Sequence, residues 1–101
     1  MESKLYQNRS FETINYSEQS LANTEFVNCQ FINCNFSKSD LSHNDFLDCT
    51  FKNCNLSLAT LRNTGLKNIQ FIGCKLMGLD FSACNSFLFS MNFQDCILDY
   101  S

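Results

Sequence analysis

The sequence predicts an all-β fold: a quadrilateral β-solenoid of about five coils, in which the chain winds repeatedly around one core. Three observations predict it. Large apolar residues recur every five positions, a small or sulfur-containing residue often lies two positions before each of them, and residue types recur after twenty positions. A helix requires a period near 3.6 and a flat strand a period of 2, so neither explains a strict period of five.

The period of five runs through most of the chain. The positions between the apolar residues are mainly Asn, Ser, Asp, Glu, Lys and Thr, so each unit is expected to bury two side chains and expose three. The chain must then turn a corner every five residues. The fifteen consecutive apolar centres are Phe11, Tyr16, Leu21, Phe26, Phe31, Phe36, Leu41, Phe46, Phe51, Leu56, Leu61, Leu66, Phe71, Leu76 and Phe81.

The period of twenty indicates that four units form one square coil. One column of equivalent positions holds Phe11, Phe31, Phe51 and Phe71, and another holds Ile14, Cys34, Cys54 and Cys74. Stacked coils pair like neighbouring strands, about 4.8 Å apart, so the phenylalanine rings should stack as a core ladder. We expect a single solenoid domain over residues 9–101, preceded by a lead-in of residues 1–8.

The register shifts by two residues after Phe81. With that shift Phe93 extends the phenylalanine ladder and Cys96 extends the cysteine column, which predicts a small bulge within residues 82–87. Phe87 and Phe89 then fall at outward positions. Exposed aromatic residues are unusual on so polar a surface, so these two either cover the bulge or form a contact site.

Composition excludes several classes of function. The chain has 101 residues and a net charge of −3 without an acidic or basic block, which argues against a nucleic-acid-binding arm or a membrane-surface anchor. The N-terminus lacks the apolar stretch of a signal peptide, and no run approaches the ~18 apolar residues of a membrane span. We therefore expect a cytoplasmic protein, in which the seven cysteines are mostly free thiols.

The cysteines raise the question of zinc, redox chemistry or packing. The Cys-x4-Cys pairs Cys29/Cys34 and Cys49/Cys54 are each separated by one corner of the predicted square. A structural zinc site needs four converging ligands, whereas stacked thiols form a line and point in the same direction. The repeat explains every cysteine except Cys84, so we favour packing over a metal site, a disulfide or a redox pair.

Nothing else in the sequence indicates catalysis or a bound cofactor. The only histidine, His43, is expected at an outward corner without a partner column. No nucleophile–base–acid set, phosphate-binding glycine loop or pair of carboxylates in a cleft can be assembled. Four Asn-x-Ser sequences, at Asn8, Asn15, Asn35 and Asn55, are interpreted as by-products of the repeat.

The run "CQFINCNFSKSDLSHNDFLDCTFKNCNLSLATLRN", residues 29–63, resembles the pentapeptide-repeat family. The resemblance covers residues 9–100 and implies a right-handed quadrilateral β-helix. The part "CTFKNCNLSLATLRN" looks like the quinolone-resistance, topoisomerase-protecting group, whose members are similar to a DNA duplex in shape and charge. The resemblance implies a protein partner, DNA gyrase or topoisomerase IV, and a homodimer formed through the C-terminal end. This chain departs from that group in lacking a terminal helix and a long loop.

Charge gives mixed support to DNA mimicry. B-DNA carries nearly three phosphates in the length of one ~4.8 Å coil, whereas ten acids and seven bases leave this chain far less net charge per coil. Five acids nevertheless gather on the faces centred on Leu41 and Phe46, with Lys38, Arg62 and Lys67 among them. This region is either a solvated face or an acidic docking stripe. The candidate partner-binding residues are Glu25, Asp40, Asp45, Asp48, Asp80, Phe87 and Phe89.

Two functional hypotheses follow. The first is a non-enzymatic interaction protein that binds a type II topoisomerase by partial DNA mimicry and is linked to quinolone resistance. The alternative is a structural scaffold or spacer, or a fragment of a longer pentapeptide-repeat protein, without partner specificity of its own. An enzyme or metalloprotein is a third, weaker reading.

Overall fold

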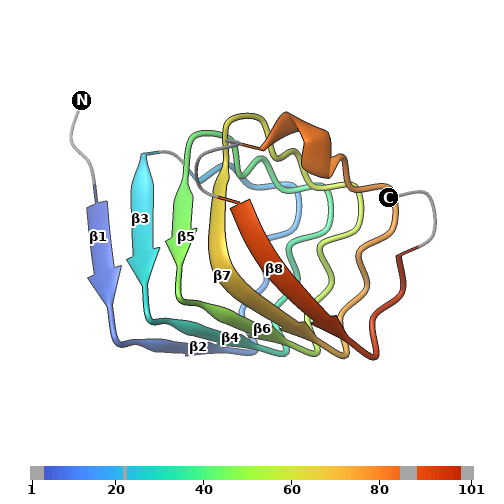
Figure 1. The fold of residues 1–101 in the computed structure, drawn as a ribbon, viewed down its shortest axis with the longest axis horizontal. Coiled ribbons are helices and arrows are strands. Elements are labelled where there is room, and N and C mark those ends of the chain that lie inside the picture. Colours follow the sequence, from blue (N-terminus) through green and yellow to red (C-terminus); the bar gives the residue numbers. More distant parts are fainter. Residues whose placement is uncertain (1–3, 22, 85–88, 99–101) are drawn as a thin grey trace.

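The computed structural model describes residues 4–21, 23–84 and 89–98, and these form a square solenoid of parallel strands (Figure 1). Two faces of the square carry regular strands, and strand β7 turns the corner between them. The first face holds β1 (Lys4–Gln7), β3 (Thr24–Val27), β5 (Asp45–Leu47) and the start of β7 (Gly65–Ile72). The second face holds β2 (Ser10–Glu12), β4 (Gln30–Ile32), β6 (Thr50–Lys52) and the end of β7, and β8 (Phe89–Gln94) pairs along β7.

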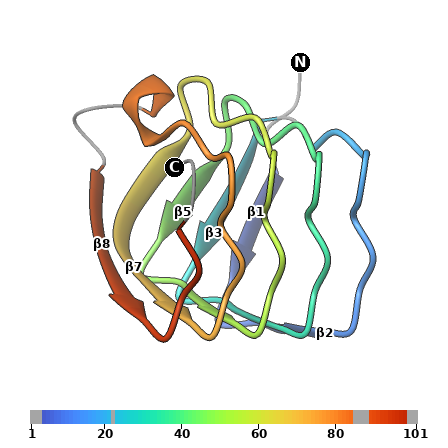
Figure 2. The same cartoon turned by 90° about the vertical axis from the view of Figure 1, so that its right-hand side faces the viewer.

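The other two faces are held by isolated parallel bridges between successive coils. One face pairs Asn15 with Asn35, Asn35 with Asn55, Asn55 with Lys75 and Lys75 with Ile97. The other pairs Ser20 with Asp40 and Asp40 with Thr60. Figure 2 shows the coils following one another around the core. The described residues form four complete coils and a partial fifth, in agreement with the predicted number of about five.

Each corner is made by one residue in the left-handed region of backbone conformation. These residues recur every five positions, from Asn8 (φ 55°) to Gly78 (φ 69°). Asparagine adopts this conformation more readily than most residues, and glycine adopts it without steric cost. The corner amides also join the coils, because Asn8 N–H donates to the Val27 carbonyl at 3.0 Å and Asn28 N–H to the Leu47 carbonyl at 2.9 Å. The corners therefore explain much of the chain's asparagine content.

The core is built around the phenylalanine ladder. Phe31, Phe51 and Phe71 are register partners on successive coils, with stacked ring centroids 4.8 Å and 5.2 Å apart. Phe11 and Phe93 extend the stack at its two ends, at 5.1 Å and 5.5 Å. Rings from neighbouring columns meet the ladder edge-on and so interlock the faces of the square.

The predicted irregularity near the C-terminus is present, but it combines a 3₁₀ helix, an insertion and a bulge in β7. Phe71 pairs with Phe93, an offset of twenty-two, as the predicted two-residue shift requires. Leu66, however, pairs with Phe89, an offset of twenty-three, and the register changes between Leu66 and Ile69. A 3₁₀ helix, η1 (Phe81–Ala83), precedes this segment, where no helix was predicted. The insertion is thus three residues before β8, and a one-residue bulge in β7 reduces it to two.

At this bulge a side-chain oxygen accepts the inter-coil hydrogen bond that a backbone carbonyl accepts at other corners. At two equivalent corners, Asn28 and Asp48 donate their amides to the carbonyls of Leu47 and Lys67. At the next corner, Asn68 N–H donates to the hydroxyl of Ser90 at 2.7 Å. Ser90 Oγ therefore takes the place of a backbone carbonyl.

The segment that precedes the solenoid is shorter than predicted. Lys4–Gln7 already forms β1 and pairs in parallel with β3, with Tyr6 opposite Phe26. The solenoid therefore begins by Lys4 and not at residue 9. The reason is that Tyr6 occupies an apolar centre five residues before Phe11, which extends the repeat by one unit. Among the described residues, no helix is long and apolar enough to cross a membrane.

Candidate functional site

The six cysteines that follow the repeat lie at inward positions and act as hydrogen-bond donors as well as core residues. Each thiol of the column donates to the carbonyl of the phenylalanine one coil back. The four Sγ–O distances are 3.4 Å for Cys34 to Phe11, 3.1 Å for Cys54 to Phe31, 3.1 Å for Cys74 to Phe51 and 3.2 Å for Cys96 to Phe71. Cys29 and Cys49 donate in the same way to Tyr6 and Phe26, and all seven thiols are free.

Two of the thiols, Cys49 and Cys84, are poor nucleophiles in this setting. Burial is the main cause that raises the pKa of Cys49, to about 12. Burial, with a smaller contribution from the charge of Asp80, raises the pKa of the off-repeat Cys84 to about 11. Since the thiolate is the reactive form, both residues are protonated and unreactive near neutral pH.

Polar residues at the same inward position as the cysteines make equivalent hydrogen bonds, which the spacing of the repeat does not predict. Thr64 Oγ1 donates to the Leu41 carbonyl at 2.7 Å, and Asn44 Nδ2 to the Leu21 carbonyl at 2.8 Å. Asn44 is fully buried, and its Oδ1 accepts the Thr24 amide at 2.9 Å. Both residues lie two positions before an apolar centre, as the cysteines do. That position therefore selects a small donor, whether thiol, hydroxyl or carboxamide.

No catalytic constellation forms around His43. Its side chain is exposed, its backbone has φ 62°, and its amide donates to the Arg62 carbonyl at 3.1 Å, which makes it a corner residue as predicted. Within the part of the chain that the structure describes, no group of three or more His, Cys, Asp or Glu could enclose a metal ion.

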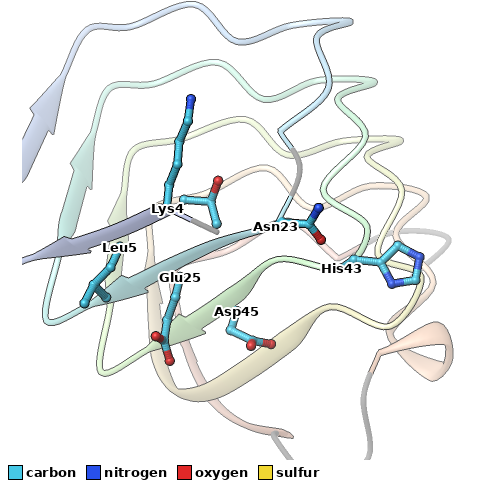
Figure 3. Close-up of a pocket in the computed structure, with 7 residues that line it drawn as sticks. Lys4, Leu5, Asn23, Glu25, His43 and Asp45 are labelled. Atoms are coloured by element: carbon cyan, nitrogen blue, oxygen red, sulfur yellow. The ribbon is translucent and has the colours of Figure 1, made fainter. Parts of the chain in front are cut away.

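The strongest candidate for function is an acidic face, which we define as Glu25, Asp40, Asp45 and Asp48. Glu25 and Asp45 are register partners on β3 and β5, so their backbones lie one coil apart. They border a shallow hollow of about 260 Å³, which Lys4, Leu5, Asn23, Thr24 and His43 also line. Figure 3 shows the two carboxylates side by side on successive strands. Two adjacent carboxylates on a fixed sheet attract cationic groups such as guanidinium.

The other acids also have structural roles. Asp48, at the corner after β5, accepts a hydrogen bond from Asn68 Nδ2 at 2.7 Å. Asp40 accepts the Ser42 amide at 3.0 Å, and hydrogen bonds from Ser42 are the main cause that holds the pKa of Asp40 below its usual value. Asp80 accepts the amide of Ser82 and caps η1, two coils from Asp40, so it lies apart from the acidic face.

The remaining candidates are only partly described. Phe87 lies outside the described residues. Phe89 opens β8 opposite Leu66, and its side chain lies outside the described part of the structure. Their proposed outward position therefore stays a prediction.

Three of the four Asn-x-Ser sequences, those at Asn15, Asn35 and Asn55, correspond to a local turn. Ser17, Ser37 and Ser57 each donate the backbone amide to the side-chain oxygen of the Asn two residues earlier, at 2.9–3.0 Å. Asp40 and Asp80 make the same turn with Ser42 and Ser82. Since Asn or Asp followed two positions later by Ser is thus part of how the coil is built, the motif has a structural explanation.

The sequence over residues 24–101 matches the profile of the pentapeptide repeat region. The chain belongs to the pentapeptide repeat family. As a pentapeptide repeat protein, it owes its corners, its two inward positions per unit and its stacked columns to that repeat. No curated protein sequence matches the chain significantly.

Solved structures of other pentapeptide repeat proteins share the fold. Full-length QnrB1, a plasmid-mediated fluoroquinolone resistance protein, superposes with a TM-score of 0.64 at 20% identity, over 91% of this chain and 43% of that one. A trypsin-treated form of QnrB1 gives 0.58 at 24% identity, over 93% and 53%. A pentapeptide repeat protein from the thylakoid lumen of Arabidopsis thaliana gives 0.56 at 16% identity, over 88% and 61%. This chain therefore spans about half the length of QnrB1, and the likeness shows the fold.

Proposed function

We propose that this chain is a non-enzymatic, cytoplasmic interaction protein whose acidic face binds a basic surface of another protein. The observation that carries the proposal is the stacking of Glu25 and Asp45 on adjacent strands, with Asp40 and Asp48 at the flanking positions. The strand register fixes the spacing of the backbones that carry Glu25 and Asp45, so that part of the arrangement needs no ordering on binding. An acidic surface of this kind also speeds association with a basic partner and repels nucleic acid.

The most specific form of the proposal is a type II topoisomerase, DNA gyrase or topoisomerase IV, bound by partial mimicry of DNA. Structural similarity to QnrB1, a fluoroquinolone resistance protein, supports it. Charge restricts the mimicry to one region. Over the 35 Å of the longest dimension, B-DNA would carry about 20 phosphates, whereas this chain has a net charge of −3. The acidic face, rather than the whole rod, would meet the DNA-binding surface of the enzyme.

Charge reversal tests the proposal. The triple variant Glu25→Lys, Asp45→Lys, Asp48→Lys should lose binding to gyrase, and gyrase supercoiling with a fluoroquinolone should become insensitive to added protein. A matched control reverses two exposed acids elsewhere on the solenoid, Glu12→Lys and Glu18→Lys. Circular dichroism should show the same fold for all forms. Equal binding by the triple variant and the wild type would rule out the acidic face as the binding surface.

The scaffold alternative rests on a different observation. Phe93, Ile97 and Leu98 of the last described coil are 41%, 44% and 40% exposed. Phe93 and Leu98 also line an apolar hollow of about 430 Å³ together with Phe81. End-to-end association, including a homodimer through the C-terminal end, would cover these side chains. Light scattering separates the two functions, because a scaffold would grow with concentration while an interaction protein would form a complex of fixed stoichiometry with its partner.

A further inference from the structure

The cysteine column, Cys34, Cys54, Cys74 and Cys96, places sulfur atoms at a regular spacing along the core. The residues that follow these cysteines pair in register, Asn35 with Asn55, Asn55 with Lys75 and Lys75 with Ile97. Each sulfur lies 3.1–3.4 Å from the carbonyl oxygen of the phenylalanine one coil back. Because this pose repeats from coil to coil, neighbouring sulfurs are separated by about one coil step, ~4.8 Å.

That spacing suits an ion with two thiolate ligands in a line. Taking the zinc–thiolate bond length of about 2.3 Å as a guide, two opposed metal–thiolate bonds span about 4.6 Å. Since no group of three or more ligands converges among the described residues, tetrahedral zinc is excluded there. Soft cations such as Cu(I) prefer thiolates and accept two-coordinate geometry.

We propose that Cys74 and Cys96 form a linear binding site for a single Cu(I) ion. The reaction is Cu(I) plus two thiols giving a bis-thiolate complex and two protons, with no change of oxidation state. The complex carries one negative charge, which is costly to bury. Cys74 is itself 1% exposed, but its partner Cys96 is half-buried at the end of the described column, whereas both members of the Cys34–Cys54 pair are buried, at 3% and 2% exposure. The ion therefore has access and partial solvation from the Cys96 side of this pair, and neither deeper in the column. This site lies in the core and shares no residue with the acidic face.

The test is anaerobic titration of the full chain with Cu(I), supplied as its acetonitrile complex, in competition with a colorimetric Cu(I) chelator. We expect one ion bound, two protons released, and X-ray absorption showing two sulfur ligands. Cys96→Ser should weaken binding by more than the ~10–100-fold that even outer-shell changes cause at metal sites. This variant should fold, because Ser39 at an equivalent position already donates its hydroxyl to the Tyr16 carbonyl one coil back.

Cys84→Ser is the matched control, since Cys84 lies outside the column. It should leave the affinity and the proton count unchanged. Loss of binding in Cys84→Ser, an unchanged affinity in Cys96→Ser, or a site with three or more sulfur ligands would each overturn the proposal. Failure of the wild type to compete with the chelator at all would also overturn it.

Discussion

Truncation of Phe51 is the most direct test of the stacked core. Its side chain is fully buried, and its ring stacks on Phe31 at 4.8 Å and on Phe71 at 5.2 Å. It also meets Phe46 and Phe36 edge-on, at 5.4 Å and 5.9 Å. Phe51→Ala removes all four ring contacts and leaves a cavity in the middle of the ladder. Because coils pack on both sides of this position, the surrounding side chains cannot easily move in to fill the cavity.

The expected loss of unfolding free energy in Phe51→Ala lies in the upper part of the range measured for buried phenylalanines. Truncation of a buried phenylalanine costs about 3–5 kcal/mol, and aromatic pairs add roughly 0.5–1.5 kcal/mol beyond the area they bury. We therefore expect Phe51→Ala to lower the free energy of unfolding by about 4–5 kcal/mol, against a total of ~5–15 kcal/mol for a small domain. Phe93→Ala, at 41% exposure and with stacking on one side only, should cost about half as much or less.

Urea denaturation followed by circular dichroism measures both variants. Coils in a solenoid contact only their neighbours, so a break at Phe51 should also broaden the transition as the two halves uncouple. A loss below about 1.5 kcal/mol for Phe51→Ala, or a loss no greater than that of Phe93→Ala, would contradict the interlocked ladder. Either result would mean that the rings are not the main source of stability.

Three further predictions concern a corner, a buried amide and a carboxylate. Leu58 has φ 63° and is 57% exposed, so Leu58→Asn should stabilise the chain by about 1 kcal/mol in thermal melts; a lower melting temperature would contradict the corner's preference. Asn44→Ala leaves the Thr24 amide and the Leu21 carbonyl without this partner and should cost about 2–5 kcal/mol in urea; a neutral result would show that water replaces it. The folded pKa of Asp40 is lowered, so its contribution to stability is present above its unfolded pKa of about 4 and is lost as pH falls through the folded value. Asp40→Asn should remove that part of the acid dependence, as measured by melts between pH 2 and pH 5 (roughly the range in which aspartate titrates), and an unchanged profile would refute it.

Much of the fold follows from side-chain size and period, which are local properties of the sequence. The alignment of Phe31 with Phe51 and of Glu25 with Asp45 follows from counting by twenty, and the register agrees. Hydrogen bonds between coils could not be predicted in this way. The spacing places Asn44 at an inward position, two residues before Phe46, but nothing local shows that the Leu21 carbonyl needs a donor.

The C-terminal irregularity could likewise be predicted only in part from the sequence. Counting apolar centres predicts the net shift of two residues, which Phe71 and Phe93 confirm. It does not divide that shift into three extra residues before β8 and a bulge in β7, since the division depends on how Ser90 satisfies the Asn68 amide. The same holds for Asp40 and Asp80, whose charge is evident from the sequence but whose turns with Ser42 and Ser82 are not.

The corner at every fifth residue has a consequence for how such a protein can change its length. Removing or adding a whole coil of twenty residues would move everything beyond it by about 4.8 Å along the axis and leave every side chain facing the same way. A change of five residues would instead turn the rest of the molecule by a quarter of a revolution, so that a patch of charge would continue on a different side. Insertions of other sizes must be absorbed locally, as the segment before β8 does when it returns Phe93 to its column. A surface pattern therefore stays on one face of this fold only when insertions or deletions comprise whole coils.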